Sequence, residues 1–289
     1  MKSLVIGLGI GSLYKSVLES FGAQVFTVDS NPQRSADFLD VDQAIAAHQY
    51  FDTAHICTPN FTHAELANKV ASHARLVFVE KPGVKNSKEW RSILKLHPNT
   101  RFMMVKNNQW RDNIDELADL ANSSKNIKLC WINKNRIPYP GSWFTNKELA
   151  FGGVSRDLLP HLLSYFIAFE PNYEQAVWLK SHCWQQWRLQ DLTHSDYGIV
   201  DHKGVYNVDD RVELSCNIEH RHYEIIADWR SNNEDDIAIY FDDKRIQLDL
   251  CPESAYARMI ETAVRNLNND AFWLNQTRQD MWIHTKIKL

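Results

Sequence analysis

The sequence predicts a two-domain protein, in which an α/β domain with a doubly wound parallel sheet precedes an α+β domain with a mainly antiparallel sheet. In the first hundred residues, short apolar runs alternate with segments of helical spacing. That alternation ends after residue 106, and beyond residue 175 several segments alternate apolar with polar residues instead. The length of 289 residues is enough for two domains of ordinary size.

The predicted strands of the N-terminal domain are short and continuously apolar. They cover residues 3–6, 23–28, 55–57, 75–79 and 101–105, and the predicted helices cover residues 13–21, 33–38, 42–47, 62–72 and 87–96. Apolar strands that alternate with helices of this length are typical of a parallel sheet covered on both faces. Right-handed crossovers then give the doubly wound arrangement.

The second part of the chain has a different rhythm. We expect helices at 114–121, 154–168 and 255–267, an irregular segment at 133–146, and strands at 127–132, 211–220, 222–229, 236–241 and 245–250. The period-two pattern of the later strands indicates antiparallel pairing. We place the boundary near residue 110, which gives domains of residues 1–110 and 111–289.

Composition excludes several classes of function. Hydrophobic residues at 44%, a net charge of -4 and the absence of a dense Lys/Arg block give no reason to expect nucleic acid or an anionic membrane as partner. Five scattered cysteines lack a CxxC pair, and the histidines outside the motifs, including those at 220 and 222, lack metal-ligand spacing. We therefore expect no metal site, reduced and mostly buried thiols, and surface positions for those histidines. No apolar run is long enough to span a bilayer, so we expect a cytoplasmic protein.

The run VIGLGIGS matches the start of a dinucleotide-binding fingerprint. Gly7 and Gly9 occupy the first two glycine positions of G-x-G-x-x-G, whereas Ser12 stands at the third with Gly11 beside it. A following helix N-terminus supplies amide donors for a pyrophosphate. Asp29 ends the next strand, where it accepts hydrogen bonds from ribose hydroxyls and repels a 2′-phosphate, which favours NAD over NADP. A purely structural glycine turn is the alternative.

Two further strand ends carry polar residues. CTPNFTH follows the third strand and VFVEKPG contains the fourth, and ligands of open α/β sheets bind outside the carboxyl ends of the strands. A lysine there, Lys81, is suited to hydrogen-bond a reacting oxygen, although a surface lysine is an equal alternative. The candidate cofactor-binding residues are Gly7, Gly9, Ile10, Gly11, Ser12, Asp29, Thr58, Pro59, Asn60, His63, Glu80, Lys81 and Pro82.

The stretch GGVSRDLLPHLLSYF brings an acid and a base into an apolar segment. Asp157 and His161 are four residues apart, a spacing that puts both on one helical face. Pro160 lies between them, and an interior proline costs a helix roughly 3 kcal/mol. Either the regular helix begins close to Pro160 or its first turn is distorted. A purely structural role for the pair is the alternative on this stretch alone.

Together these motifs resemble a known family. GLGIGS, Asp29, CTPNFTH, VEKPG and GGVSRDLLPH, in this order and spacing, look like the glucose-fructose oxidoreductase, inositol dehydrogenase and MocA (Gfo/Idh/MocA) family of NAD(P)-dependent oxidoreductases. EKP followed by GG-x-x-x-D-x-x-x-H is a more specific combination than the glycine loop. The resemblance implies a Rossmann domain, then a substrate-binding and oligomerisation domain with a large open, mostly antiparallel sheet, and a homo-oligomer (dimer or tetramer) through that sheet.

The resemblance also implies the catalytic set. The family's lysine, aspartate and histidine meet around the substrate carbon, and the matching residues here are Lys81, Asp157 and His161. A histidine that titrates near neutrality suits proton transfer from or to the reacting oxygen, which we assign to His161. Lys81 stabilises alkoxide character on that oxygen, and Asp157 holds a substrate hydroxyl or orients its neighbours.

The chain departs from many relatives after the fifth strand, where it reads VKNNQWRDN. Asn108 there is a candidate substitute for the relatives' substrate contacts. Arg136, Tyr139 and Trp143 in NKNRIPYPGSWF are candidate substrate contacts because their side chains suit sugar stacking or an anionic group. A packing loop is the alternative for each.

The sequence thus predicts an NAD-dependent oxidoreductase acting on a secondary hydroxyl or ketone of a carbohydrate-like small molecule: a sugar, cyclitol or nucleotide-linked sugar. Two alternatives stay open. One is a catalytically silent dinucleotide-binding sensor. The presence of Lys81, Asp157 and His161 argues against it. The other is a reductase of a non-sugar ligand, such as a linear tetrapyrrole or an imine, whose family members generally depart from EKP.

Overall fold

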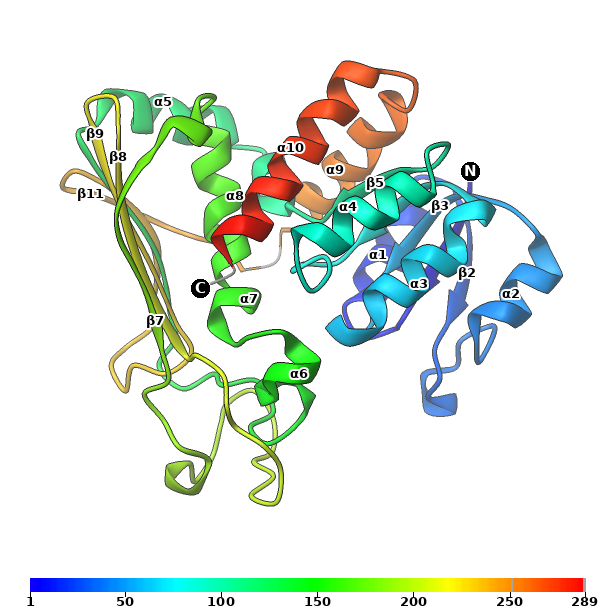
Figure 1. The fold of residues 1–289 in the computed structure, drawn as a ribbon, viewed down its shortest axis with the longest axis horizontal. Helices are drawn as coiled ribbons and strands as arrows, with labels where there is room; N and C mark the ends of the chain where they lie inside the picture. Colours follow the sequence, from blue (N-terminus) through cyan, green and yellow to red (C-terminus); the bar gives the residue numbers. More distant parts are fainter. Residues whose placement is uncertain (251, 288–289) are drawn as a thin grey trace. The chain divides into compact units, whose positions relative to one another are not determined.

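The computed structural model describes residues 1–250 and 252–287 and divides into two compact units. The first contains Met1–Val105 together with Glu253–Thr285, and the second contains Lys106–Pro252 and the end of the chain from Lys286. Figure 1 shows the elements of both units. The sequence-based assignment of residues 111–289 to one domain is thereby amended, since the two C-terminal helices pack with the first unit.

The first unit is built on a parallel sheet with strand order β2-β1-β3-β4-β5. This confirms the doubly wound α/β prediction. The strands are β1 (Lys2–Ile6), β2 (Gln24–Val28), β3 (Phe51–Ile56), β4 (Ala74–Val79) and β5 (Arg101–Met104). The helices are α1 (Gly11–Ser20), α2 (Val41–His48), α3 (His63–Val70), α4 (Ser87–Leu96), α9 (Glu253–Arg265) and α10 (Asp270–Lys286).

The predicted helix at 33–38 is wrong. Only a 3₁₀ turn, Pro32–Arg34, forms there, and the chain then runs beside β2. The Asp37 carboxylate accepts hydrogen bonds from the Thr27 amide and hydroxyl at 2.8 and 2.7 Å, which holds the segment against β2. This tertiary contact overrides the weak helical pattern.

The C-terminal helices join the first unit through specific contacts. Tyr256 on α9 packs edge-on against Tyr14 with ring centroids 5.2 Å apart. On α10, His284 stacks on Trp90 at 5.7 Å and Asp280 accepts a hydrogen bond from the Met104 amide. The sequence did not predict α10, because its buried positions include polar residues and so do not form an apolar stripe. His284 is buried, as is His55 on β3, so the expectation that such histidines lie at the surface is wrong for both.

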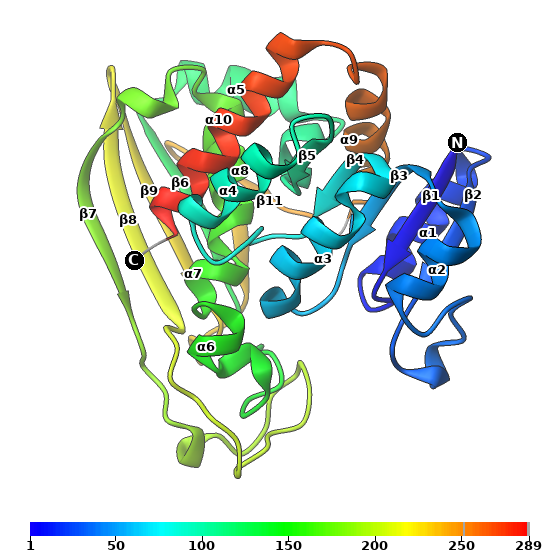
Figure 2. The same cartoon turned by 45° about the vertical axis from the view of Figure 1, so that its right-hand side comes forward.

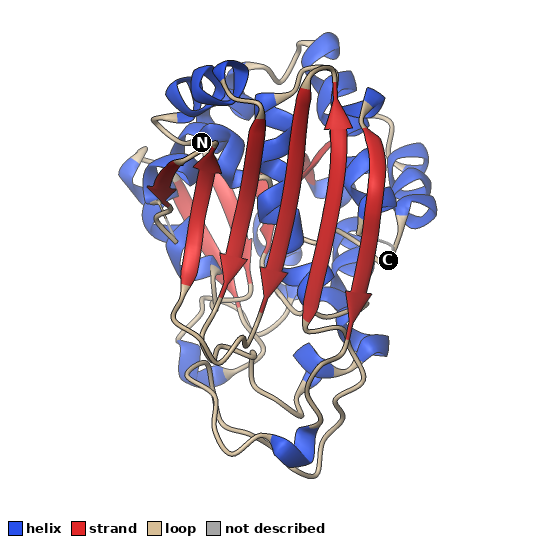
Figure 3. Cartoon of the chain, turned by 90° about the vertical axis from the view of Figure 1, so that its left-hand side faces the viewer, coloured by secondary structure: helices blue, strands red, loops and turns tan. Residues whose placement is uncertain are grey.

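The second unit contains a sheet with strand order β11-β10-β6-β9-β8-β7, seen face-on in Figure 3. Its β6–β9 pair is parallel and the other pairs are antiparallel, which confirms the mostly antiparallel prediction. The strands are β6 (Asn126–Ile132), β7 (Val177–Trp184), β8 (Arg211–Ile218), β9 (Arg221–Asp228), β10 (Asp236–Phe241) and β11 (Lys244–Gln247). The sequence did not predict β7, whose residues are mostly exposed.

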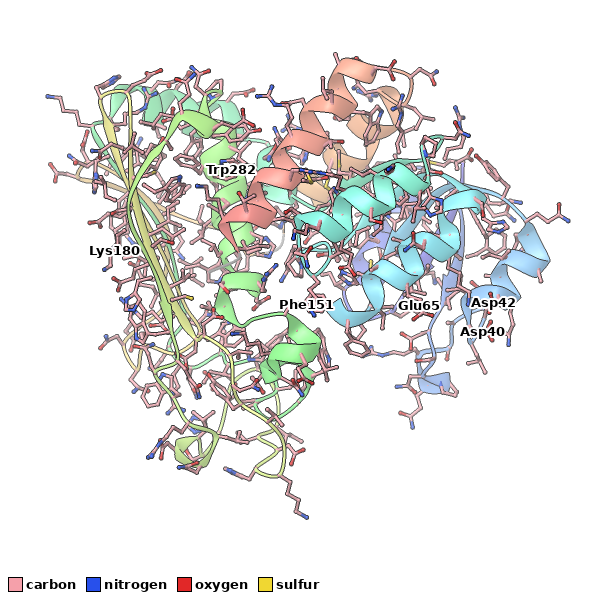
Figure 4. The ribbon with its side chains drawn as sticks, viewed as in Figure 1. Asp40, Asp42, Glu65, Phe151, Lys180 and Trp282 are labelled. Carbon is pink, nitrogen blue, oxygen red and sulfur yellow. The ribbon has the colours of Figure 1, made fainter. Side chains whose placement is uncertain are left out.

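One face of this sheet is covered by helices. The helices of the unit are α5 (Ile114–Ser123), α6 (Lys147–Ala150), α7 (Val154–Asp157) and α8 (Leu159–Phe169), and α8 lies along the sheet beside α5 in both Figure 1 and Figure 2. The opposite face carries charged side chains. Lys180 on β7, labelled in Figure 4, pairs there with Glu213, which also binds Arg211 at 2.7 Å.

Four cysteines lie in the described residues and all are free thiols. Cys57, Cys130 and Cys216 are buried and Cys183 is half-buried, whereas Cys251 lies outside the described residues. Among the helices of residues 1–250 and 252–287, none combines the length and the apolar character needed to cross a membrane.

Candidate active site

The glycine loop of the first unit connects β1 to α1. Gly7 has φ +89°, and a Cβ there would lie 2.8 Å from the Cys57 carbonyl oxygen, so only glycine fits. Its amide donates to the Val28 carbonyl at 2.7 Å. Gly7 therefore has a structural role in the tight turn that the fingerprint predicts.

Gly9 and Gly11 fit the other two glycine roles of the fingerprint, the close approach of a pyrophosphate and close packing between helix and strand. A Cβ at Gly9 would meet no protein atom within 4 Å, so the fold itself does not need glycine there, and the open space fits the close approach of a pyrophosphate to the backbone. A Cβ at Gly11 would lie 2.9 Å from a methyl of Val5. Gly11 thus provides the close helix–strand packing that the third glycine usually provides, and Ser12, whose hydroxyl donates to the Leu8 carbonyl at 2.8 Å, does not prevent it.

The N-terminus of α1 has donors for an anion. Ile10 is the N-cap residue and makes no side-chain cap hydrogen bond, so no capping side chain competes with a ligand for the positive end of the helix dipole. The residues of this loop consequently fit the pyrophosphate of a dinucleotide.

Asp29 follows β2 directly, as the ribose-binding acid of the fingerprint does. Its carboxylate already accepts two main-chain hydrogen bonds, from Leu8 at 2.7 Å and from Asn31 at 2.8 Å. A carboxylate has about four acceptor positions, so it can accept ribose hydroxyls as well. Asp29 therefore both fixes the shape of the glycine loop and places a negative charge beside it.

His63, the first residue of α3, connects two other predicted loops. Its Nδ1 lies 2.6 Å from the Gly83 carbonyl and its Nε2 lies 2.8 Å from the Thr58 carbonyl. Burial lowers the pKa of His63, the two carbonyl contacts oppose that shift, and the charge of Lys81 adds to it. Because the side chain is fully buried, His63 holds the loops after β3 and β4 together and does not present an atom to a cofactor.

Glu80 and Lys81 follow β4, and a buried tyrosine supports them. Tyr14 on α1 donates its hydroxyl to Glu80 at 2.5 Å, and the second carboxylate oxygen of Glu80 accepts the Lys81 amide at 3.1 Å. Burial and the neighbouring Glu80 raise the pKa of Tyr14 well above its usual value. Tyr14 remains a neutral donor, and the backbone that carries Lys81 is fixed.

In the second unit, α7 and α8 carry Asp157 and His161. α7 ends at Asp157 and α8 begins at Leu159, so Pro160 occupies the second position of a new helix, where its missing amide costs nothing. Of the two explanations for Pro160, a helix start is therefore correct. From Val154 to Ile167, Asp157 and His161 are the only residues that are not buried.

The second of the two glycines before α7, Gly153, is needed because of Asp209. A Cβ at Gly153 would lie 1.7 Å from the Asp209 carbonyl oxygen. That oxygen accepts the Val154 amide at 2.9 Å, and the Asp209 carboxylate accepts the amides of Gly153 and Ser155 at 3.0 and 2.7 Å. Asp209 thus caps α7, which ends in Asp157. Phe151, with φ 69°, forms the bend before the glycines and is labelled in Figure 4.

Two tryptophans of the sheet contact the acid and the base. The Trp229 indole donates to the Asp157 carboxylate at 2.9 Å. Trp131 stacks on the His161 ring, with centroids 5.3 Å apart and planes 28° apart. Sequence reasoning identified neither tryptophan, nor Asp209, because each is a single residue in or near a strand with no motif around it.

The four substrate candidates lie in two groups. Asn108 is buried and donates to the His161 carbonyl at 3.1 Å, so it supports the backbone of α8. The Arg136 amide donates to the Trp229 carbonyl at 2.8 Å, which puts this residue beside the partner of Asp157. Tyr139 and Trp143 instead each stack on Phe144, at 6.2 and 3.8 Å, in an aromatic cluster of their own.

The proposed catalytic residues come from both units. Lys81 belongs to the first unit, whereas Asp157 and His161 belong to the second, where both side chains are partly exposed. No group of three or more His, Cys, Asp or Glu side chains with metal-binding geometry occurs in the described part of the chain.

Comparison with known proteins identifies relatives of both units. Residues 2–106 match the Gfo/Idh/MocA family model, described as an oxidoreductase family with an NAD-binding Rossmann fold. A curated protein of Amycolatopsis mediterranei (strain S699), a putative UDP-kanosamine synthase oxidoreductase subunit, is 28% identical in an alignment of 265 residues that covers 83% of this chain and 71% of that protein.

Solved structures share the fold at low identity. GenD2 from gentamicin A biosynthesis, in complex with NAD, superposes with a TM-score of 0.74 at 14% identity, covering 100% of this chain and 92% of that one. Levoglucosan dehydrogenase, in complex with NADH and levoglucosan, gives a TM-score of 0.70 at 15% identity, covering 99% of this chain and 95% of that one. Residues 2–106 thus resemble the NAD-binding Rossmann domain of the Gfo/Idh/MocA oxidoreductases, and the chain as a whole shares the fold of these solved structures.

Proposed function

We propose that the chain is an NAD-dependent oxidoreductase that transfers a hydride between the nicotinamide and a secondary alcohol or ketone of a sugar, cyclitol or nucleotide-linked sugar. One observation carries the proposal. In an otherwise buried segment, Asp157 and His161 alone remain partly exposed, and each is supported by a tryptophan. A fold that used them only for packing has no reason to leave an acid and a base accessible side by side.

The substrate class has support from the relatives. One relative is named for UDP-kanosamine synthesis and another was solved with levoglucosan, a sugar derivative. Carbohydrate hydroxyls need hydrogen-bond acceptors and stacking surfaces, and the second unit offers Asp157 together with the half-exposed aromatic ring of Tyr139.

In this proposal the three catalytic residues divide the chemistry. When bound, the nicotinamide exchanges a hydride with the substrate carbon. His161 takes the proton of the hydroxyl in oxidation and returns it in reduction. The Lys81 ammonium donates a hydrogen bond to the reacting oxygen and stabilises negative charge on it, and Asp157 accepts a hydrogen bond from a neighbouring hydroxyl.

The preference for NAD over NADP is also part of the proposal. The Asp29 carboxylate is held beside the glycine loop by two main-chain amides, where its charge opposes a 2′-phosphate. The family description names NAD, and the structures of the two solved relatives contain NAD or NADH. The cytoplasmic location stays a prediction.

We further propose a homo-oligomer, a dimer or tetramer, formed through the helix-free face of the six-stranded sheet. That face carries side chains of both signs, including the Lys180–Glu213 pair. Two copies related by a twofold axis can therefore match opposite charges across it. Sedimentation or mass photometry at micromolar concentration measures the oligomeric state, and a monomer contradicts this proposal.

The test is a nicotinamide absorbance assay against sugars, inositols and nucleotide sugars, in both directions and with NAD(H) and NADP(H). We expect His161→Ala to lower kcat by about 10²-fold to 10⁴-fold while the dissociation constant of NADH stays unchanged. His182→Ala is the matched control, since His182 also stacks on a tryptophan of the same unit, Trp184, at 4.4 Å.

Lys81→Ala should also remove turnover, and Lys85→Ala, which changes an exposed lysine four residues along, should not. Tight NADH binding with no turnover on any substrate would point instead to a sensor. An active His161→Ala variant would refute the assignment of the proton-transfer residue.

A further inference from the structure

The two tryptophans under the acid and the base are neighbours on one sheet. β6 and β9 pair in parallel with Trp131 opposite Ala227. Trp229 lies directly after the end of β9, and because Trp229 reaches Asp157 on α7 and Trp131 reaches His161 on α8, both indoles lie on the side of the sheet that these helices cover. Trp229 therefore contacts Asp157, and Trp131 contacts His161, four residues later.

Two main-chain hydrogen bonds fix the backbone of Trp229. Its amide donates to the Asp210 carbonyl at 3.0 Å and its carbonyl accepts the Arg136 amide at 2.8 Å. Asp209, which precedes Asp210, caps the N-terminus of α7, and Asp157 lies at the C-terminus of the same helix. One short segment, residues 209–210, therefore locates both the helix of Asp157 and the indole that binds its carboxylate.

The indole hydrogen bond is not one that the fold requires. A buried Trp N–H needs an acceptor, but a main-chain carbonyl is sufficient. Trp187 donates to the Arg230 carbonyl and Trp273 to the Asn266 carbonyl, each at 2.9 Å. Trp229, which is 1% exposed, instead donates to the carboxylate of Asp157, a partly exposed residue.

The contact with the imidazole is of a different kind. Trp131 stacks on His161 with the ring planes 28° apart, which limits rotation of the imidazole about its χ2 angle. The backbone of His161 is held separately, by the Asn108 amide group. The stack therefore controls the direction of the ring nitrogens and not the position of the helix.

We infer that Trp229 and Trp131 are positioning residues of the active site: Trp229 fixes the carboxylate of Asp157 through its indole N–H, and Trp131 fixes the ring plane of His161. This inference rests on the proposed function. It predicts that Trp229 affects turnover only through Asp157, whereas a tryptophan that merely fills the core affects turnover independently of Asp157.

A double-mutant cycle on the full-length protein tests the first half. Trp229→Phe, which keeps the ring and removes the donor, should lower kcat about tenfold and leave the dissociation constant of NADH unchanged. In an Asp157→Ala background, where His161 still supports slow turnover, Trp229→Phe should lower kcat by less than twofold. Trp273→Phe, which removes an indole donor to a main-chain carbonyl of the first unit, is the control and should not change kcat.

The second half is tested by rescue. Trp131→Leu should lower kcat about fivefold with KM unchanged, and Trp131→Phe, which restores a stacking surface, should recover most of it. If Trp229→Phe does not fold, Trp229→His and Trp229→Leu take its place. Trp229→His keeps a ring N–H, so its turnover should exceed that of Trp229→Leu.

The outcomes separate the two proposals. Equal losses from Trp229→Phe in the wild-type and Asp157→Ala backgrounds, or no rescue by Trp131→Phe, overturn the positioning inference and leave the proposed function standing. A wild-type protein that turns over no substrate overturns the proposed function, and the positioning inference with it.

Discussion

The glycine loop of the first unit and the α7 segment of the second both need glycine, but for different reasons. At the loop, Gly7 and Gly11 are required by contacts with the adjoining strands, while Gly9 faces open space. At α7, Gly153 is required because a main-chain carbonyl of Asp209, 56 residues away in sequence, passes where a Cβ would be. The first region is largely determined by its own supersecondary unit, and the second depends on distant parts of the chain.

The same contrast holds for the functional side chains. Asp29 is held by amides of the glycine loop and the next turn, 21 and 2 residues away. Asp157 is held by Trp229, 72 residues away, and the His161 backbone by Asn108, 53 residues away. A local site has a sequence signature that can be recognised, whereas a site built from distant supports has only fragments of one.

The largest effect that we expect from this contrast is at Gly153. Gly153→Ala places a methyl against a backbone oxygen that cannot turn aside, and should lower the free energy of unfolding by about 3 kcal/mol and remove activity. Gly9→Ala should leave stability within about 0.5 kcal/mol and weaken NADH binding about tenfold, which is 1.4 kcal/mol. Urea unfolding and NADH fluorescence titration measure the two effects.

These two variants act as controls for each other. If Gly9→Ala destabilises the fold, or if Gly153→Ala melts like the wild type, the contrast between the local and the long-range site is wrong. Unchanged NADH affinity in a stable Gly9→Ala variant argues against a pyrophosphate at this loop.

The next effect is the change in stability at low pH, which should be opposite in sign for the two units. Burial lowers the pKa of His55 to about 3, so its protonation favours unfolding, and stability present above its unfolded pKa of 6.5 is lost as pH falls. The cost at pH 5 is about 2 kcal/mol. Burial raises the pKa of Asp210 to about 6, although its hydrogen-bond donors oppose this shift. The charged carboxylate therefore destabilises the fold above pH 6, and stability is gained as pH falls below 6.

Hydrogen exchange of peptides from each unit at pH 7 and pH 5, corrected for intrinsic rates, measures this difference. We expect the strands around His55 to lose protection and the strands around Asp210 to keep or gain it. His55→Leu should reduce the acid sensitivity of the first unit, and His63, whose pKa is also lowered by burial, accounts for part of what remains. Equal loss of protection in both units at pH 5 contradicts the prediction.

The smallest effect is a change of cofactor preference at Asp29. Asp29→Asn keeps an oxygen for the Leu8 amide and removes the charge that opposes a 2′-phosphate. The ratio of kcat/KM for NAD over NADP should fall about tenfold, or 1.4 kcal/mol, with the melting temperature little changed. If the ratio stays constant, Asp29 acts on the loop alone and the basis for NAD preference lies elsewhere.

Much of the fold could be predicted because it follows local patterns. β10 and α4 begin and end where the sequence predicts them, since their apolar periodicity and the Asn86 cap are local signals. The errors have tertiary causes. Residues 33–38 form no α-helix because Asp37 binds Thr27 and Phe38 pairs with Val28, and α10 was missed because it buries Gln276, Gln279 and His284 instead of an apolar stripe.

The sequence alone therefore determined the fold class, the glycine loop with Asp29, and the candidates Lys81, Asp157 and His161, because these depend on short-range spacing. Only the tertiary structure decided that Gly11 replaces the third glycine, that Pro160 starts a helix, and that His63 is a buried connector. It also decided which residues support the acid and the base. Trp229, Trp131 and Asp209 reach them through strand pairing and long-range hydrogen bonds, and such contacts leave no periodicity or motif in the sequence.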